Sequence, residues 1–365
     1  MSPLDIPDSP LDITPQWLNE ALSTTNTFSN AVVTSLQIEP IAKLTSVGQL
    51  ARLHLKLSHP RSTLPKKLIA KLHAPDEIQR AKTRLYMPDK SEISFYRQLA
   101  GEIPLRTPHC YFSAMNVSLG KYIRILEDLA PAKVGNQIDG STMQETASAL
   151  REIAGFHAYW WKNKRLGTFD WLANSQMDSK TTTDWILNQY REAFPVFVGK
   201  LGTSLTDSVK TFGEQLPERL TGKNQLGELP RTIIHGDFRL ENVFFGDSLG
   251  ESGLAVIDWQ DISRGEGVSD VAWFIGGCLK NTPNRQREER QLLKTYHETL
   301  VANGVTGYTM NVCWNDYRLA IRRYFVQAVL MVASLNPENL RENRLARAVS
   351  ERFIAAVIDL RLNEA

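Results

Sequence analysis

The chain has 365 residues, of which 42% are hydrophobic and 22% charged, and its formal net charge is +2. These values are typical of an ordinary globular protein, and so small a net charge excludes a global attraction to nucleic acid or to a membrane surface. A chain of this length is too long for one simple core and suggests two lobes or domains.

The first part of the chain, up to about residue 126, mixes strand-like runs with one clear helix. Apolar and β-branched runs predict strands at 32–40, 51–57, 67–72, 110–115 and 122–126. The last two runs flank the polar, Gly-terminated loop 116–120, which predicts a hairpin. Segment 89–100 predicts a helix that ends at Gly101. We therefore expect residues 1–126 to form a β-rich, nucleotide-binding N-terminal lobe.

From about residue 141 the pattern is mostly helical. Apolar residues at three-to-four spacing predict helices at 142–163, 182–200, 204–216, 286–303, 313–335 and 341–362. Within this half, the short apolar runs 243–245 and 254–257 flank a Gly-rich turn and predict a β-hairpin. The predicted fold class is α+β, with a hinge at 127–135, a helical C-terminal lobe at 136–365 and a cleft between the lobes.

The most informative motif is HGDFRLEN at 235–242, followed by IDW at 257–259. Asp237 and Asn242 have the Asp-x-x-x-x-Asn spacing of a phosphotransferase catalytic loop. Transfer of the terminal phosphoryl group of ATP needs a carboxylate that orients the attacking hydroxyl and accepts its proton. It also needs an amide oxygen and a second carboxylate to hold Mg²⁺ on the phosphates. We therefore predict ATP and Mg²⁺ as cosubstrates, with Asp237 as the base and with Asn242 and Asp258 as metal ligands.

Other residues of the motif have less specific patterns. His235 is interpreted as a packed, hydrogen-bonded scaffold residue, since the base is already supplied two positions later. Arg239 either screens the developing phosphoryl charge or anchors the loop. Glu241 is interpreted as an exposed loop residue. Asp270, in the segment GEGVSDVAW, either caps a helix N-terminus or bonds to the backbone of the catalytic loop.

Lys71 and Glu92 are predicted to form the pair that anchors the nucleotide phosphates. Lys71 ends the strand-like run 68–71, from which a lysine can reach a phosphate as a point charge. On the predicted helix, Glu92 shares its face with Phe95, Tyr96 and Leu99, and a carboxylate there is costly unless it is paired. The alternative is that Glu92 lies in the first helical turn and only complements the helix dipole.

Two further segments are assigned to nucleotide binding by their position in the chain. The loop 46–51 contains Ser46 and Gly48, and its backbone N–H groups could cover the phosphates. The segment 127–131 follows the last predicted strand of the first lobe and precedes the helical half. Its residues Glu127 and Leu129 would present backbone groups to the adenine. Pro131 and Gly135 support a linker here.

The motifs HGDFRLENVFF, VIDWQ and GEGVSDVAWF together resemble the aminoglycoside phosphotransferase and choline kinase superfamily, which has a protein-kinase-like two-lobed fold. ILEDLAP at 125–131, Asp-Trp-Gln after the hairpin and LREIAGFHAYWW at 150–161 are similar to its ecdysteroid kinase-like branch. The resemblance runs from about residue 40 to about residue 335. It implies ATP, Mg²⁺ and the roles given above. The loop at 46–51 has one Gly where protein kinases have three, and His157 with Trp160 and Trp161 is interpreted as helix packing.

The acceptor is predicted to be a small-molecule alcohol. Only ten residues, 260–269, separate the Asp258 region from the next helix entry, which is too few for an activation segment that presents a peptide. Trp185, Trp273, Tyr317 and Tyr324 are candidate walls of the acceptor site. Because 313–335 contains Arg318, Arg322 and Arg323, a polycationic acceptor is less favoured than a neutral, partly apolar alcohol or a sugar. The alternative function is a catalytically inactive nucleotide-binding regulatory protein of the same fold.

The remaining expectations concern location and partners. Residues 1–15 lack the basic and apolar runs of a signal peptide, and the longest apolar stretch, 324–335, is far short of the roughly 20 residues of a membrane span. Three cysteines, Cys110, Cys278 and Cys313, lack metal-ligand spacing and are interpreted as reduced thiols. We expect a cytoplasmic monomer or homodimer with no nucleic-acid or membrane partner.

Overall fold

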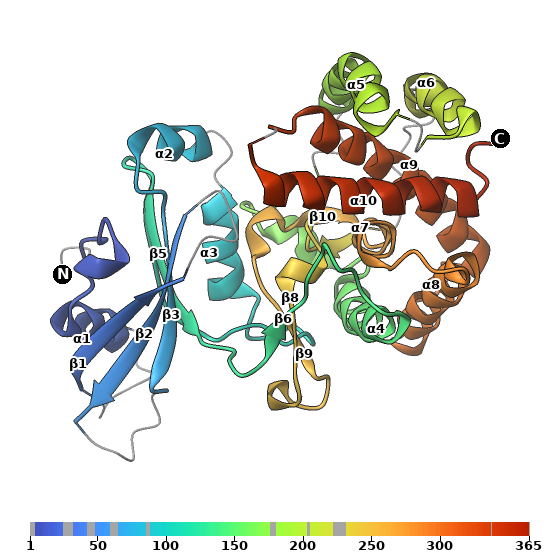
Figure 1. Cartoon of the computed structure of the whole chain (residues 1–365). Helices are drawn as coiled ribbons and strands as arrows, with labels where there is room; N and C mark the ends of the chain where they lie inside the picture. The colour runs from blue at the N-terminus through green and yellow to red at the C-terminus, as the bar shows by residue number, and fades with distance from the viewer. Residues whose placement is uncertain are drawn as a thin grey trace. The chain divides into compact units, whose positions relative to one another are not determined.

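The computed structural model describes residues 4–24, 32–41, 48–58, 65–84, 88–175, 180–202, 205–221, 231–336 and 338–364. The chain divides into two compact units, shown in Figure 1. Unit 1 comprises Met1–Glu102 and Thr107–Pro131, and unit 2 comprises Ile103–Arg106 and Ala132–Ala365. Across these described ranges, no helix is long and apolar enough to cross a membrane.

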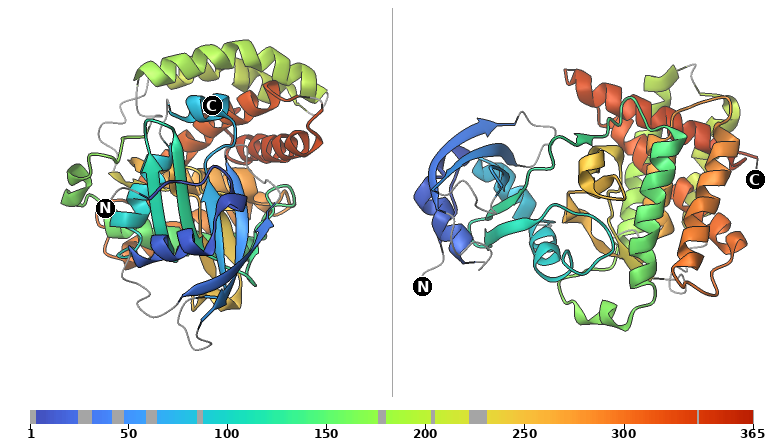
Figure 2. Two further views of the ribbon diagram at one scale, coloured as in Figure 1. Left: turned by 90° about the vertical axis from the view of Figure 1, so that its left-hand side faces the viewer. Right: turned by 90° about the horizontal axis from the view of Figure 1, so that it is seen from below.

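Unit 1 is built on an antiparallel five-stranded sheet in the order β1-β2-β3-β5-β4 (Figure 2). All five predicted strands are present: β1 Val33–Pro40, β2 Gln49–Leu57, β3 Lys67–Leu72, β4 Cys110–Asn116 and β5 Lys121–Glu127. In β2 and β3 every second residue is buried, as the period of two of a strand requires. These inward side chains form the core of the unit: Ala51, Leu53, Leu55, Leu68, Ala70 and Leu72.

Helices complete unit 1. The predicted helix at 89–100 is observed as α3 Pro88–Gln98. Phe95 within it and Leu99 directly after it are fully buried. Helix α1 Pro15–Ser23 begins at the Thr14 N-cap, whose hydroxyl accepts a hydrogen bond from Trp17 N–H, and its apolar side joins the core of the sheet. Helix α2 Glu77–Arg84 is strongly polar. Neither α1 nor α2 was predicted from the sequence.

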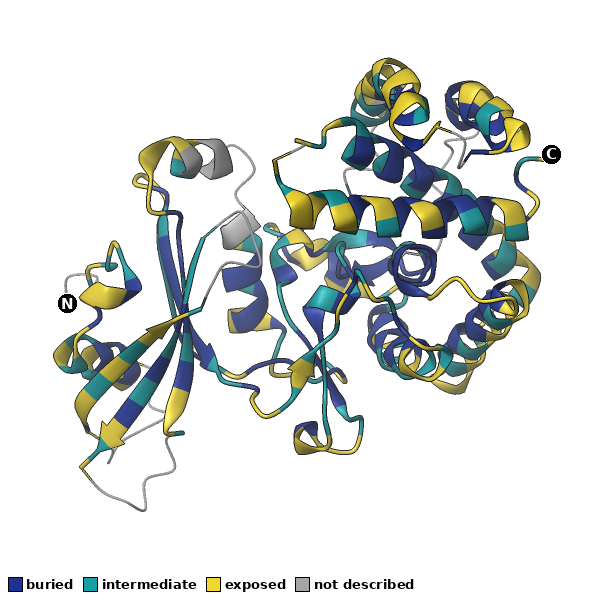
Figure 3. Ribbon diagram, viewed as in Figure 1, coloured by how far each residue is buried: buried dark blue, intermediate teal, exposed yellow. Residues whose placement is uncertain are grey.

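Unit 2 is mostly helical, and Figure 3 shows that the inner faces of its helices are buried. The six predicted helices are observed as α4 Met143–Trp160, α5 Lys180–Leu201, α6 Asp207–Thr221, α8 Arg285–Ala302, α9 Met310–Ala333 and α10 Leu340–Asp359. A further helix, α7 Val268–Cys278, packs against α9 and α10. Gly276 permits this packing, because a Cβ atom there would lie 2.4 Å from Phe353.

Two small sheets lie within unit 2. The predicted hairpin is observed as β8 Val243–Phe245 and β9 Leu254–Val256, with β6 Lys133–Val134 as a third strand beside β8. A second pair consists of β7 Arg231–Ile234 and β10 Ser263–Glu266. The strands β7 and β8 flank the HGDFRLEN motif, and β9 and β10 flank the segment that contains Asp258. The pairing of these short strands therefore brings the two motif segments together.

Candidate active site

The carboxylate of Asp237 is held by three N–H donors. Its Oδ2 accepts from Arg239 Nε at 2.8 Å and from Asn242 Nδ2 at 3.0 Å. Its Oδ1 accepts from the indole Nε1 of Trp273, also at 3.0 Å. Since a guanidinium, an amide NH₂ and an indole N–H can only donate, both oxygens of Asp237 act as acceptors in this arrangement. The contact with Trp273, which lies 36 residues further along the chain, was not predicted.

The amide of Asn242 has a defined orientation. Its Nδ2 donates to the backbone oxygen of Asp237 at 2.8 Å as well as to Oδ2 of the same residue. Both hydrogens of the NH₂ group are thereby used, and a flipped amide would place its oxygen against two other oxygens. The side-chain carbonyl Oδ1 of Asn242 is therefore left as the group that can coordinate a cation.

Asp258 lies next to Asn242 across the β8–β9 hairpin. Val243 pairs with Val256, and Ile257 N–H donates to the Asn242 carbonyl at 2.9 Å. Asp258 then adopts the left-handed conformation, with φ of 66°, which Asp and Asn tolerate better than other side chains. The following Trp259 is fully buried against the rings of His235 and Phe156. This local geometry turns the chain directly after the hairpin, with Asp258 at the turn.

Asp270, the third residue of α7, bonds to the backbone of the catalytic loop. Its Oδ2 accepts from His235 N–H at 2.7 Å, and its Oδ1 accepts from Gly236 N–H at 3.0 Å. His157 Nε2 also lies 3.2 Å from Oδ2, and its Nδ1 lies 3.0 Å from the hydroxyl of Tyr296. Of the two alternatives for Asp270, the structure thus has the bond to the loop; the N-cap position of α7 is Gly267. His157 is buried, in agreement with the packing interpretation.

Gly236 is required by a close backbone approach. Its φ of 87° is in the left-handed region, and a Cβ atom at this position would lie 2.2 Å from the backbone oxygen of Asp261. A backbone oxygen cannot move aside as a flexible side chain can. The absence of a side chain at 236 therefore allows the loop that carries Asp237 to lie against the segment that carries Asp258.

Glu241 belongs to an ion-pair chain, so its interpretation as an exposed loop residue is wrong. Its Oε2 lies 2.7 Å from Arg239 Nη1, its Oε1 lies 2.6 Å from Arg341 Nη2, and its side chain is 12% exposed. Arg239 also contacts Asp237 at 2.8 Å. Of the two alternatives for Arg239, these contacts favour anchoring of the loop.

A third carboxylate, Asp261, is not identified by the sequence pattern. As a whole, the residue Asp261 is exposed to solvent. Burial of its carboxyl group by surrounding atoms, together with the neighbouring charges of Asp237 and Asp258, nevertheless raises the pKa of this carboxyl group to about 6. The direction follows because both desolvation and like charges disfavour ionisation. Its only signal in the sequence is an acidic residue three positions after Asp258, which by itself is common in loops.

In unit 1, Lys71 and Glu92 form the predicted pair, with Lys71 Nζ 2.8 Å from Glu92 Oε2. Arg124 Nη2 lies 2.9 Å from the same oxygen, so Glu92 bridges two cations. Arg124 and Glu92 are almost completely buried, and Arg124 stands directly opposite Lys71 in the β3–β5 register. The ion pair of Arg124 with Glu92 was not predicted. A sequence signal for it exists, because an arginine inside the apolar strand run 122–126 needs a charged partner if it is buried.

The remaining predicted contacts of the nucleotide have different surroundings. Ser46 lies outside the described residues. Gly48 is in close contact with the end of β3, because a Cβ there would lie 2.5 Å from the Leu72 backbone oxygen. Glu127 Oε2 accepts a hydrogen bond from His109 N–H at 3.0 Å, and Leu129 is buried. The Glu127 side chain therefore has a structural partner within unit 1.

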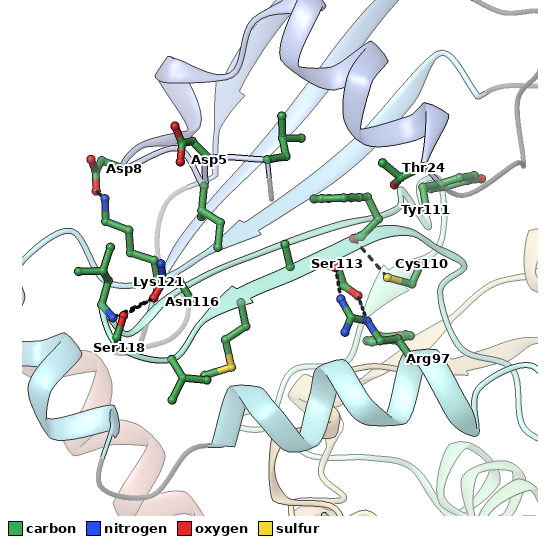
Figure 4. Close-up of a pocket in the computed structure, with 18 residues that line it drawn as sticks. Asp5, Asp8, Thr24, Arg97, Cys110, Tyr111, Ser113, Asn116, Ser118 and Lys121 are labelled. Atoms are coloured by element: carbon green, nitrogen blue, oxygen red, sulfur yellow. Dashed lines mark hydrogen bonds and ion pairs between the residues drawn. The ribbon is translucent and has the colours of Figure 1, made fainter. Parts of the chain in front are cut away.

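Neither a compact metal cluster nor the cavity of unit 1 marks this site. Within the described ranges, no group of three or more His, Cys, Asp or Glu side chains could hold a metal ion. A cavity of about 1050 Å³ lies along the edge strand β4 and beneath the N-terminal segment (Figure 4). Its lining belongs entirely to unit 1 and includes none of the predicted site residues. The candidate site rests on the hydrogen-bonded motif residues and not on this cavity.

This combination of fold and motif defines a protein with the architecture of small-molecule kinases. The model of the ecdysteroid kinase-like family matches residues 46–305, which is more than half of the chain. The chain therefore belongs to the ecdysteroid kinase-like family, and the α+β, protein-kinase-like fold predicted from the sequence is confirmed.

Solved structures with this fold are distant in sequence. A protein named as a candidate aminoglycoside phosphotransferase from Ralstonia eutropha JMP134 has a TM-score of 0.52 at 15% identity, over 93% of this chain and 96% of that one. Choline kinase from Cryptosporidium parvum Iowa II has a TM-score of 0.51 at 10% identity, over 90% and 89% of the two chains. At these identities the likeness shows the fold alone.

One curated relative is considerably longer. The Caenorhabditis elegans protein called uncharacterized oxidoreductase dhs-27 is 22% identical over 87% of this chain. The chain spans 41% of the length of that protein.

Proposed function

We propose that the chain is an ATP-dependent phosphotransferase that transfers the γ-phosphoryl group to a hydroxyl of a small molecule. The observation that carries this proposal is the arrangement at Asp237. Its carboxylate is fixed by three N–H donors, and one of them, Asn242, is oriented so that its carbonyl oxygen remains for a cation. Family membership and the kinase fold support it independently.

In the proposed reaction, Asp237 orients the acceptor hydroxyl and takes its proton. The hydroxyl oxygen forms a bond to the γ-phosphorus while the bond from that phosphorus to the β–γ bridging oxygen breaks, and the electron pair leaves with ADP. Arg239 and Trp273 keep the carboxylate in place during this step and do not themselves gain or lose protons. A side chain held from both of its oxygens costs little reorganisation when the charge shifts, which is the advantage of a preorganised site.

Asn242 and Asp258 are the residues we propose to hold Mg²⁺. An amide oxygen and a carboxylate are both hard oxygen ligands, and Mg²⁺ bound by kinases takes its other ligands from phosphates and water. Two protein ligands therefore suffice, which is consistent with the lack of a larger acidic cluster among the described residues. When bound, the ion would neutralise the charge that develops on the phosphate oxygens.

The proposed roles in unit 1 concern nucleotide binding. Lys71 would contact the phosphates, with Glu92 and Arg124 fixing its position. The loop with Ser46 and Gly48 would offer backbone N–H groups to the phosphates. The hinge segment 127–135 would contact the adenine through the backbone of Glu127 and Leu129.

The acceptor is proposed to be a small alcohol. Between η8 Trp259–Asp261 and α7, the chain is occupied by β10, which pairs with β7. No length remains there for a long peptide-presenting segment.

Thermal unfolding with and without ATP, each with and without Mg²⁺, is the first test. A ligand at 100 times its dissociation constant stabilises the folded state by about 2.7 kcal/mol, which is measurable. We expect a stabilisation by ATP that depends on Mg²⁺. ADP release would then be measured with gentamicin, choline, ethanolamine and ecdysone as acceptors.

The variant Asp237→Asn separates the kinase from an inactive nucleotide-binding protein. It should abolish ADP release and retain most of the ATP-dependent stabilisation. Full turnover by this variant would exclude Asp237 as the base. Binding of ATP by the wild type without ADP release from any acceptor would favour the regulatory alternative.

A further inference from the structure

The two oxygens of Asp237 are not equivalent. Each carboxylate oxygen has two lone pairs, and Oδ2 uses both of them for Arg239 and Asn242. Oδ1 accepts one hydrogen bond, from Trp273, and so retains one acceptor position. The side chain of Asp237 is 23% exposed, so a molecule from solvent can reach it.

We propose that Trp273 and Tyr324 form the acceptor-hydroxyl subsite, and that Oδ1 of Asp237, fixed by Trp273, is the oxygen that receives the proton of the acceptor. This inference rests on the proposed kinase function. The HGDFRLEN motif does not itself identify which residues contact the acceptor.

The indole of Trp273 packs against two other helices. Trp273 lies on α7, and its ring packs on Tyr324 of α9 at 4.9 Å between centroids and on Phe353 of α10 at 5.6 Å. A ring packed in this way has little freedom to rotate, so its N–H points in a fixed direction. The direction of the Trp273 hydrogen bond therefore determines which lone pair of Oδ1 is left.

Tyr324 supplies a second polar group next to the indole of Trp273, on which its ring packs. Burial, and then the charges of Asp270 and Asp237, raise the pKa of its phenol, so the hydroxyl stays protonated and can donate. Over the part of the chain that the structure describes, its hydroxyl has no hydrogen-bond partner. Tyr317 differs, because it is fully buried and donates to Glu289, so its prediction as a wall of the acceptor site is wrong.

These contacts indicate the chemistry of the acceptor. Its hydroxyl would donate to Oδ1, and the carbon that bears the hydroxyl would lie at the edge of the Trp273 and Tyr324 rings. A second polar atom of the acceptor would accept a hydrogen bond from the Tyr324 hydroxyl. A neutral alcohol with an apolar carbon body and a second oxygen meets all three conditions. During transfer, the O–H proton moves to Oδ1 while the acceptor oxygen bonds to the γ-phosphorus and the bond from that phosphorus to the β–γ bridging oxygen breaks, so that ADP leaves with the electron pair.

The test compares two variants at the same position. Trp273→Phe keeps a large aromatic ring and loses the N–H, whereas Trp273→His has a smaller ring and can place its Nε2–H where the indole N–H was. The assay is ADP release from MgATP at pH 8, where a histidine of ordinary pKa is neutral. Cyclohexane-1,2-diol is the neutral probe, choline is the cationic probe, and water alone gives the base line.

We expect Trp273→Phe to lower kcat about 30-fold with KM for ATP within twofold, and Trp273→His to retain kcat within about fivefold of the wild type. A purely structural role predicts the reverse order, since the histidine leaves the larger gap in the ring cluster. Trp314→Phe, elsewhere on α9, is the matched control and should match the wild type. Tyr324→Phe should raise KM for the diol at least fivefold.

The outcomes separate this inference from the function on which it rests. A wild type that releases no ADP, even with water, would overturn the proposed function and this subsite with it. An active wild type whose Trp273→Phe variant is unimpaired would overturn the subsite alone. Turnover with choline but not with the diol would overturn the assignment of a neutral acceptor.

Discussion

Replacing Asp270 with Asn tests whether this buried carboxylate holds the catalytic loop. The carboxylate accepts three hydrogen bonds, from His235 N–H at 2.7 Å, Gly236 N–H at 3.0 Å and His157 Nε2 at 3.2 Å. It is completely buried, so water cannot replace a lost partner. Asn has the same shape but only one acceptor oxygen, and its NH₂ group must face at least one of these donors.

The cost can be worked from those three bonds. One donor is left without an acceptor, which costs about 1–3 kcal/mol, and the others lose the strengthening of a charged acceptor, about 1 kcal/mol each. The buried charge is removed as well, which offsets part of this cost. We expect a net loss of about 3 kcal/mol. For a chain of this length, that is a decrease in Tm of about 4 °C.

Differential scanning calorimetry and steady-state ADP release are the two measurements. We expect the decrease in Tm together with at least a tenfold loss of kcat, because the His235–Gly236 backbone is no longer fixed next to Asp237. Asp247→Asn is the control, since Asp247 is exposed on a loop of the same unit. If Asp270→Asn matched this control in both Tm and kcat, the carboxylate would not be what positions the loop.

Three further variants probe the surroundings of Asp237. Gly236→Ala should lower Tm and abolish turnover, because its Cβ would meet the Asp261 backbone oxygen. Gly250→Ala is the control: Gly250 has a φ of 90° and open space around it, so this variant isolates the backbone strain of about 1–2 kcal/mol. Equal effects of the two variants would exclude the steric argument. Glu241→Gln should lower kcat several-fold, because it weakens the ion pair that holds Arg239. Glu251→Gln is the control, and equal kcat values for the two variants would show that this ion-pair chain does not affect turnover. Asp261→Asn should raise Tm by about 1–2 °C at pH 7.5 and not at pH 4. Because the pKa of Asp261 is raised in the folded state, the wild type loses stability as the pH rises from the pKa of an unfolded aspartate towards 6. The solvent exposure of the residue limits this loss of folding free energy to about 1 kcal/mol. A Tm difference that is the same at both pH values would contradict the raised pKa.

The elements that could be predicted are those with a strong local pattern. The alternation in β2 and β3 and the three-to-four periodicity of α4, α8, α9 and α10 are visible in the sequence because one face of each is buried in a core. The missed strands β6, β7 and β10 have two to four residues. Pairing with segments remote in sequence forms them, and so short a run has no period to detect.

The site divides in the same way. Asp237 and Asn242 could be recognised because their fixed spacing corresponds to a hydrogen bond within one loop. Lys71 and Glu92 could be paired because a carboxylate on an apolar helix face requires a partner. The contact of Trp273 with Asp237 spans 36 residues and that of Arg341 with Glu241 spans 100 residues. No local spacing encodes such contacts, since they depend on how α7 and α10 pack.

Donor and acceptor directions connect these remote contacts to the chemistry. The carboxylate of Asp270 can only accept, so His157 must present Nε2–H to it, and in a neutral imidazole Nδ1 then accepts from the Tyr296 hydroxyl. Asp270 thereby keeps its capacity for the N–H groups of the loop, and the loop in turn orients Asp237. Asp237 is therefore oriented through residues of α4, α7 and α8, and Trp273 of α7 also donates directly to its carboxylate.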